Sequence, residues 1–81
     1  MAKAPLPISP GEALAQELLD RNMTQAELAE CTAYDRPYIS RVINNRYRIS
    51  LPFAVALEEA GVGKARYWLV LQVEWELARS A

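Results

Sequence analysis

Residues able to cap the start of a helix recur at short intervals along this 81-residue chain. Ser9 and Thr24 each have a glutamate three residues later, which is the capping-box pattern in which side chain and backbone satisfy each other's hydrogen bonds. Asp35 and Ser50 precede two further apolar segments and can cap helices in the same way. This spacing limits the chain to short helices joined by short turns, and no strand pattern competes with them.

We therefore expect an all-α fold of five helices, over residues 10–21, 24–31, 35–45, 50–60 and about 64–78. The helical period predicts that their inward faces carry Leu14, Leu18 and Leu19; Ala26, Leu28 and Ala29; Ile39, Val42 and Ile43; and Phe53, Ala56, Leu57 and Ala60. Residues 1–8 hold two prolines and no helical period, so we predict a flexible N-terminal arm before a single domain at 9–81.

Composition narrows the function classes. The chain is 52% hydrophobic and has no apolar run long enough to span a membrane, and its N-terminus lacks the apolar segment of a signal peptide. It has no histidine, so the commonest general base is missing, and its lone cysteine supports neither a disulfide framework nor a zinc site. We expect a cytoplasmic domain that is not an enzyme and has no cofactor or metal, with Cys31 as a small buried hydrophobe.

The charge is segregated along the sequence. Residues 34–50 contain four arginines and one aspartate, a sum of +3, whereas the rest of the chain has five basic and nine acidic residues, a sum of -4. The two expected helices around this segment are joined by a short turn at residues 32–34, as in a helix-turn-helix whose second helix enters the DNA major groove. A basic face on an acidic chain suits a polyanionic partner.

The predicted DNA contacts follow from the helical period. With Ile39, Val42 and Ile43 turned inward, the outer surface of the 35–45 helix is expected to read bases through Arg36, Pro37, Tyr38, Ser40 and Arg41. Phosphate contacts are expected from the start of the preceding helix and from the loop that follows, through Gln25, Asn44, Asn45, Arg46 and Arg48.

The last helix is apolar around most of its circumference, which is unusual for a surface helix of a monomer. Large exposed apolar surfaces mark interfaces. We therefore predict that residues 64–78 pair two copies of the chain, with contacts from Trp68, Leu71 and Trp75.

These segments resemble a known family. TQAELAECTAYDRPYISRVINN is similar to the helix-turn-helix of Xre (Cro/C1-type) repressors, and SPGEAL, RYRIS and YWLVLQVEWELA resemble the outer motifs of HigA-type antitoxins. The resemblance implies a lambda-repressor-like fold, a homodimer that represses its own operon at a palindromic operator, and neutralisation of a HigB-type toxin that cleaves mRNA. Ala33 and Asn45 stand where this family usually has glycine.

Two alternatives stay open from the sequence. The chain could be a solitary Xre-type regulator with no toxin partner, or a protein-interaction module in which the same helices block a partner. The charge contrast favours DNA binding, because a pure interaction module has no need of a basic face.

Overall fold

The structure is a computed structural model that describes residues 8–80. Its five helices are α1 (Pro10–Asp20), α2 (Gln25–Thr32), α3 (Arg36–Ile43), α4 (Leu51–Glu59) and α5 (Ala65–Ser80), and the described residues contain no strand. The predicted all-α fold is confirmed, although α5 extends further than expected. The arm predicted for residues 1–8 lies, except for Ile8, outside the described residues.

The helix starts form as the capping pattern predicts. The Ser9 hydroxyl accepts the Glu12 amide at 3.0 Å while the Glu12 carboxylate accepts the Ser9 amide at 3.1 Å. Thr24 and Glu27 make the same pair of bonds at the start of α2. Asp35 accepts the amide of Tyr38, and Ser50 accepts the amide of Phe53. These local bonds satisfy donors that a helix cannot satisfy internally, so they fix where α1, α2, α3 and α4 begin.

The chain reverses between helices through residues with left-handed backbone. Ala33 has φ +64° after α2, and Asn45 has φ +60° after α3. The family that the sequence resembles usually has glycine at these two positions, and both adopt the left-handed conformation that glycine accommodates best. Gly61, at φ +80°, ends α4 as the sequence predicts.

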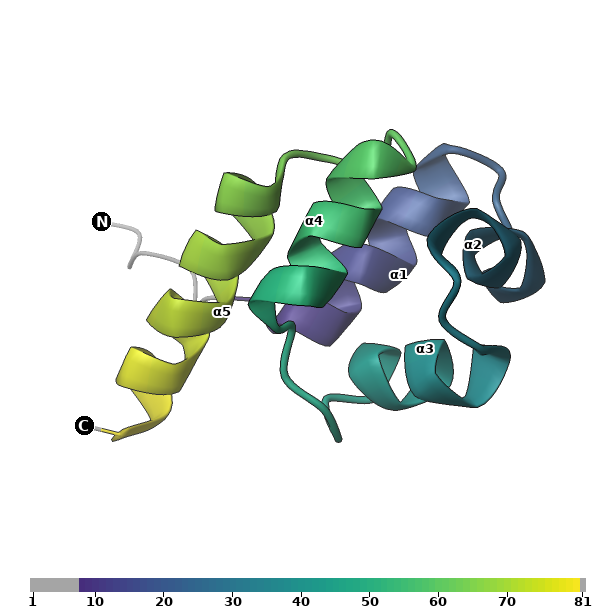
Figure 1. The fold of residues 1–81 in the computed structure, drawn as a ribbon. Helices are drawn as coiled ribbons and strands as arrows, with labels where there is room; N and C mark the ends of the chain where they lie inside the picture. The colour runs from purple at the N-terminus through teal and green to yellow at the C-terminus, as the bar shows by residue number, and fades with distance from the viewer. Residues whose placement is uncertain (1–7, 81) are drawn as a thin grey trace.

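The elements pack around one core (Figure 1). α1 and α4 lie in the middle, α5 packs against both at one end, and α2 with α3 stands at the other. All five helices and two of the connecting loops contribute fully buried side chains: Leu14, Leu28, Ile39, Val42, Ile49, Phe53, Leu57, Val62 and Trp68.

α1 and α3 approach each other closely at one point. A Cβ atom built on Gly11 would lie 2.2 Å from the carbonyl oxygen of Ile43, at the end of α3. Backbone atoms cannot move aside as a flexible side chain can, so the contact requires glycine. The N-terminus of α1 thereby supports the end of the helix that carries half of the predicted DNA contacts.

Three inward predictions are wrong. Leu19 is 70% exposed, because it lies roughly 140° around α1 from the buried Leu14. Ala26 and Cys31 are also exposed. The short helix α2 buries only a narrow face through Leu28 and Thr32. Ala26 lies about 160° around the helix from Leu28, and Cys31 lies about 60° from it.

Metal ligands and membrane-spanning segments can be assessed for residues 8–80. These residues contain no group of three or more histidine, cysteine, aspartate or glutamate side chains that could hold a metal ion. None of their helices combines the length and apolar character needed to cross a membrane.

Candidate nucleic-acid interface

The turn from α2 to α3 is fixed from both sides. On the α2 side, the Thr32 hydroxyl donates to the Leu28 carbonyl at 2.8 Å and accepts the Tyr34 amide at 3.4 Å. On the α3 side, the Asp35 carboxylate accepts the Tyr38 amide at 2.9 Å. Only three residues separate the two helices, so their relative placement depends on these bonds and on the left-handed Ala33.

α3 buries one side and exposes the other. Ile39 and Val42 are buried in the core, whereas Arg36, Pro37 and Arg41 are exposed, as the helical period predicts. The outer surface therefore presents two guanidinium groups, each able to donate a pair of hydrogen bonds to guanine O6 and N7.

Two shallow hollows lie along this surface. One, of about 510 Å³, is lined by Ser40, Arg41, Asn44 and Arg46. The other, of about 260 Å³, is lined by Gln25, Arg36, Pro37 and Ser40. The half-buried Ser40 lines both, so seven of the ten predicted DNA contacts lie on one continuous strip running from the start of α2 to the loop after α3.

Tyr38 is placed differently. Its ring packs against the rings of Tyr34, Tyr47 and Phe53, at centroid distances of 4.7, 5.3 and 5.3 Å. The side chain is half-buried in this cluster and helps to hold α3 against α4. The cluster also reaches the strip that the two hollows form, because the Arg41 guanidinium lies 5.8 Å from the centre of the Tyr47 ring.

Asn45 does not offer its side chain to a phosphate. Its amide nitrogen donates to the Ser9 hydroxyl at 2.9 Å, and its amide oxygen accepts the Gly11 amide at 3.0 Å. Both partners lie at the start of α1, so the side chain ties the end of α3 to that helix. Both polar atoms of this side chain are bonded within the chain, and the phosphate contact expected from Asn45 stays a prediction.

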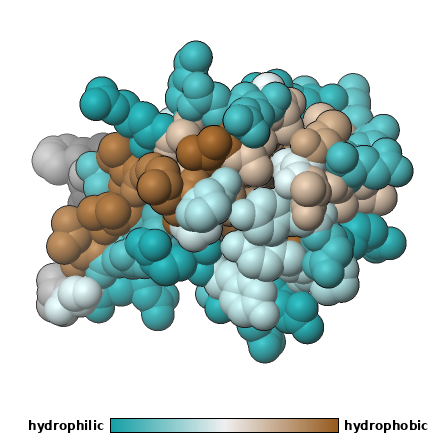
Figure 2. Space-filling view, viewed as in Figure 1, coloured by the Kyte–Doolittle hydropathy of each residue, from teal (hydrophilic) through white to brown (hydrophobic). Residues whose placement is uncertain are grey.

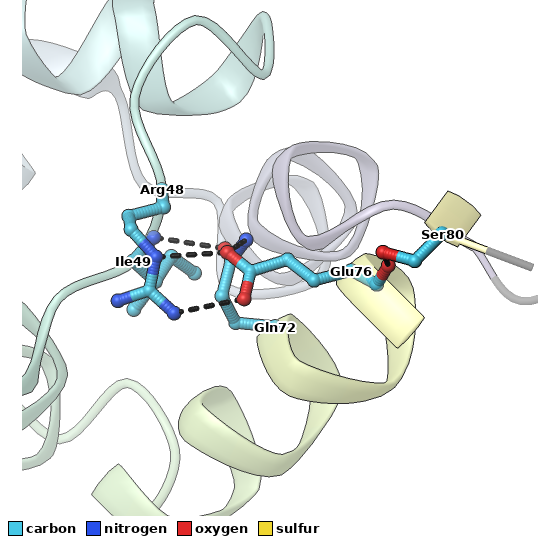
Figure 3. A network of polar contacts seen from close by, with 5 residues as sticks. All are labelled: Arg48, Ile49, Gln72, Glu76 and Ser80. Atoms are coloured by element: carbon cyan, nitrogen blue, oxygen red, sulfur yellow. Dashed lines mark hydrogen bonds and ion pairs between the residues drawn. The ribbon is translucent and has the colours of Figure 1, made fainter. Parts of the chain in front are cut away.

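Arg48 also departs from the prediction. Its guanidinium makes a two-pronged contact with the Glu76 carboxylate of α5, at 2.8 Å from Nε and 3.1 Å from Nη2 (Figure 3). The hydrogen bond from Arg48, and then that from Gln72, holds the pKa of Glu76 below its ordinary value. Arg48 is thereby turned to α5 and away from a role as a free phosphate contact.

The other three arginines of the basic segment differ from Arg48. Within residues 8–80, neither Arg36, Arg41 nor Arg46 has a carboxylate at ion-pair distance. Three guanidinium groups without an acidic partner in the described residues therefore lie on one side of a short helix and its loop.

Gln72 is a buried polar residue that the sequence pattern alone did not single out. Its side chain is buried, and its amide oxygen accepts the Ile49 backbone amide at 2.8 Å. A signal was present in principle, because Gln72 follows the buried Trp68 by four residues and so shares its inward helix face. Only the fold, however, brings Ile49 to that face.

α5 presents a different surface. Trp68 is fully buried and donates its indole N–H to the Val62 carbonyl at 2.7 Å, so its predicted role as a contact between two copies is wrong. Leu71 and Trp75 are half-buried, so the structure leaves part of each side chain accessible. Figure 2 shows hydrophobic residues gathered over α5 and the neighbouring α4. The exposed large apolar side chains of the two helices are Leu51, Val55, Tyr67, Val70, Val73 and Leu77.

Comparison with known proteins gives a consistent result. The family model described as helix-turn-helix matches residues 14–61. A protein from Nostoc punctiforme, described as a putative antidote protein of a plasmid maintenance system, is 33% identical, with a TM-score of 0.86 over 94% of this chain and 84% of its own. Pseudomonas aeruginosa antitoxin HigA, solved with the higBA promoter, is 30% identical, with a TM-score of 0.84 over 93% of this chain and 83% of its own.

A search of curated proteins found no significant match. The family match nevertheless covers more than half of the chain, and the two structural relatives align with almost all of it at about a third identical residues. The chain belongs to the helix-turn-helix family of the Xre type, among proteins similar to HigA antitoxins.

Proposed function

We propose that this protein is a sequence-specific DNA-binding repressor of the HigA antitoxin type. The observation that carries the proposal is the strip of Arg36, Arg41 and Arg46 on the outer side of α3, free of carboxylate partners within residues 8–80. The similarity of this chain to an antitoxin that was solved with a promoter supports the proposal. The family and the structural neighbours of the chain both point to a regulator that is not an enzyme.

In this proposal α3 enters the major groove. Arg36 and Arg41 read base edges, with Pro37 and Ser40 beside them, while Gln25 and Arg46 contact the phosphate backbone on either side. Asn44 lines the same hollow as Arg41 and Arg46, and its side chain donates to the Ser40 carbonyl, so it shapes the end of the strip. Arg48 and Asn45 support the loop through contacts within the chain.

A second copy completes the unit that binds DNA. The exposed Val70, Val73 and Leu77 recur at three- and four-residue spacing on the side of α5 opposite the core, the spacing by which one helix packs against another. We propose that this stripe pairs two subunits around a two-fold axis, while the half-buried Leu71 and Trp75 lie on the side of α5 nearer the core. Their α3 helices would then meet successive major grooves about 34 Å apart on a palindromic site.

The antitoxin role adds a protein partner. Both structural neighbours are described as an antidote or antitoxin, which supports a toxin-antitoxin module of the HigB/HigA kind for this chain. The toxin would be an mRNA-cleaving protein, as the family resemblance implies, and its binding would leave the arginine strip free if the protein also represses its operon. Co-expression with the product of the adjacent reading frame tests this part, and failure to form a complex would leave a solitary regulator.

Selection from random duplex DNA tests the central claim. The wild-type protein should enrich a site with two-fold symmetry, and the Arg36→Ala/Arg41→Ala variant should lose that site. The Lys64→Ala variant is a matched control, because it removes an exposed cation at the turn between α4 and α5, away from α3 and from the apolar stripe of α5. Absence of any enriched site with the wild type would overturn the proposal and leave the protein-interaction alternative.

A further inference from the structure

The loop after α3, residues 44–50, is tied to α3 at its first end. The backbone amides of Arg46 and Tyr47 both donate to the Arg41 carbonyl, at 2.7 and 3.3 Å. The loop therefore folds back over the last turn of α3, and Arg46 lies beside Arg41 in the hollow that we propose to meet DNA. Where Arg46 points depends on how the rest of the loop is held.

The second end of the loop is tied to α5 (Figure 3). The Gln72 amide oxygen accepts the Ile49 backbone amide at 2.8 Å, and the Gln72 amide nitrogen donates to Glu76 Oε2 at 3.0 Å. Glu76 also holds the guanidinium of Arg48. Two consecutive loop residues are thus bonded to two residues one turn apart on α5.

A buried amide at position 72 is not required by packing alone. Leucine would fill a similar volume on the inner face of α5, and it would be the ordinary residue beside Trp68 in a core. What leucine cannot supply is an acceptor for the Ile49 amide, which would then be buried without a partner. The glutamine is explained by the loop that it holds.

We propose that Gln72, together with Glu76, is a positioning residue for DNA recognition: it fixes loop 44–50 from α5 so that Arg46 meets the phosphate backbone. This inference rests on the proposed function, because it assigns a role within the same DNA interface. Arg48 then acts as a brace between the loop and α5, and the helix that pairs two subunits also sets the loop that touches DNA.

The central test replaces Gln72 by leucine and measures affinity for the duplex enriched by the wild-type protein. The Gln72→Leu variant should bind about tenfold more weakly, since the loop is no longer held by a buried hydrogen bond. Its log–log salt slope should become shallower by about 0.9 per subunit, because Arg46 no longer neutralises a phosphate. Circular dichroism at the assay temperature confirms that the variant is folded.

A double-mutant cycle separates positioning from a general loss of structure. If Gln72 acts through Arg46, the Gln72→Leu change should cost much less affinity in an Arg46→Ala background than in the wild type. A merely structural role would lower affinity by the same factor in both backgrounds. Equal factors would overturn the inference while leaving the proposed DNA binding intact.

Two glutamates of α5 provide a matched control for charge. Glu76→Gln and Glu74→Gln each remove one negative charge from the same helix, but Glu74 is exposed and makes no side-chain hydrogen bond within residues 8–80. Only Glu76→Gln should weaken binding. Stronger binding by Glu76→Gln than by Glu74→Gln would mean that Glu76 withholds Arg48 from DNA, which contradicts the bracing role.

A reversal variant completes the design. In Gln72→Glu/Glu76→Gln, the carboxylate at position 72 accepts the Ile49 amide. The side-chain amide at position 76 donates its N–H to that carboxylate, and its oxygen accepts from Arg48. This variant should recover most of the affinity and salt slope that Gln72→Leu loses. Failure to recover them, in a folded protein, would overturn the positioning role. Absence of any enriched duplex for the wild type would instead remove the proposed function itself.

Discussion

α3 and α5 each bury a narrow face and leave a broad one exposed, but the exposed faces differ in chemistry. α3 buries Ile39 and Val42 and exposes arginines. α5 buries Trp68 and Gln72 and exposes valine and leucine side chains. Charge left without an internal partner suits a polyanion, whereas apolar surface left uncovered suits another protein surface. The same degree of exposure therefore indicates two different partners, and the comparison can be tested by changing each face separately.

The largest effect is expected from the inner side of α5. Trp68→Ala should destabilise the fold by about 3–5 kcal/mol, because it removes the largest fully buried side chain and leaves a cavity against α4. Chemical denaturation monitored by circular dichroism measures the change. Trp75→Ala is the matched variant on the same helix and should cost much less, since that ring is only half-buried. Equal losses would contradict the two-sided description of α5.

The outer side of α5 should govern assembly. Val73→Glu should weaken self-association by about a hundredfold or more, because a carboxylate would be buried in the proposed interface in both subunits. Sedimentation equilibrium measures the change, and operator binding should fall at low protein concentration while the monomer stays folded. Leu19→Glu places the same charge at an exposed apolar site of α1 and should leave self-association unchanged. A wild-type protein that is monomeric at micromolar concentration would contradict the pairing.

Local signals allowed the sequence to predict much of this architecture. The starts of α1 to α4 each depend on residues at most three positions apart, as at Ser9–Glu12 and Thr24–Glu27, so these caps can be recognised without knowing the fold. The outward placement of Arg36 and Arg41 likewise follows from the period of one helix.

Contacts between distant residues could not be predicted in this way. Asn45 bonds to residues 34 and 36 positions away, and Arg48 to a carboxylate 28 positions away, so the partners that orient these side chains are absent from their own segment. Trp68 and Cys31 were misplaced for a related reason. An apolar helix has several faces on which a core could form, and only the neighbouring helices decide which one is buried.

The exposed side of α3 should show a smaller effect confined to DNA. Arg41→Ala should cost about 1–3 kcal/mol of operator affinity and relax the preference at one base position, while self-association and unfolding stay unchanged. Arg46→Ala should weaken all duplexes alike and make the salt slope shallower. Binding measured by fluorescence anisotropy on the selected duplex and its single-base variants distinguishes the two. A uniform loss for Arg41→Ala would place that side chain on phosphate.

The smallest effects concern the two left-handed residues that flank α3, which share a backbone conformation but differ in what their side chains do. Ala33 at φ +64° bears the steric cost of a Cβ atom in that region, about 1–2 kcal/mol, and its methyl group makes no hydrogen bond in return. Glycine relieves that cost but gives the unfolded chain more freedom, so Ala33→Gly should stabilise the fold by about 0.5–1 kcal/mol.

Asn45→Gly should have the opposite sign. It relieves a similar backbone conformation, but it also removes the bonds to the Gly11 amide and the Ser9 hydroxyl that tie the end of α3 to α1. Losing two such bonds outweighs the backbone gain, so the fold should be destabilised by about 1 kcal/mol. Denaturation curves of the two variants at one temperature measure the difference. If both variants were stabilised, backbone strain alone would decide these positions, and the Asn45 side chain would contribute little to holding α3 in place.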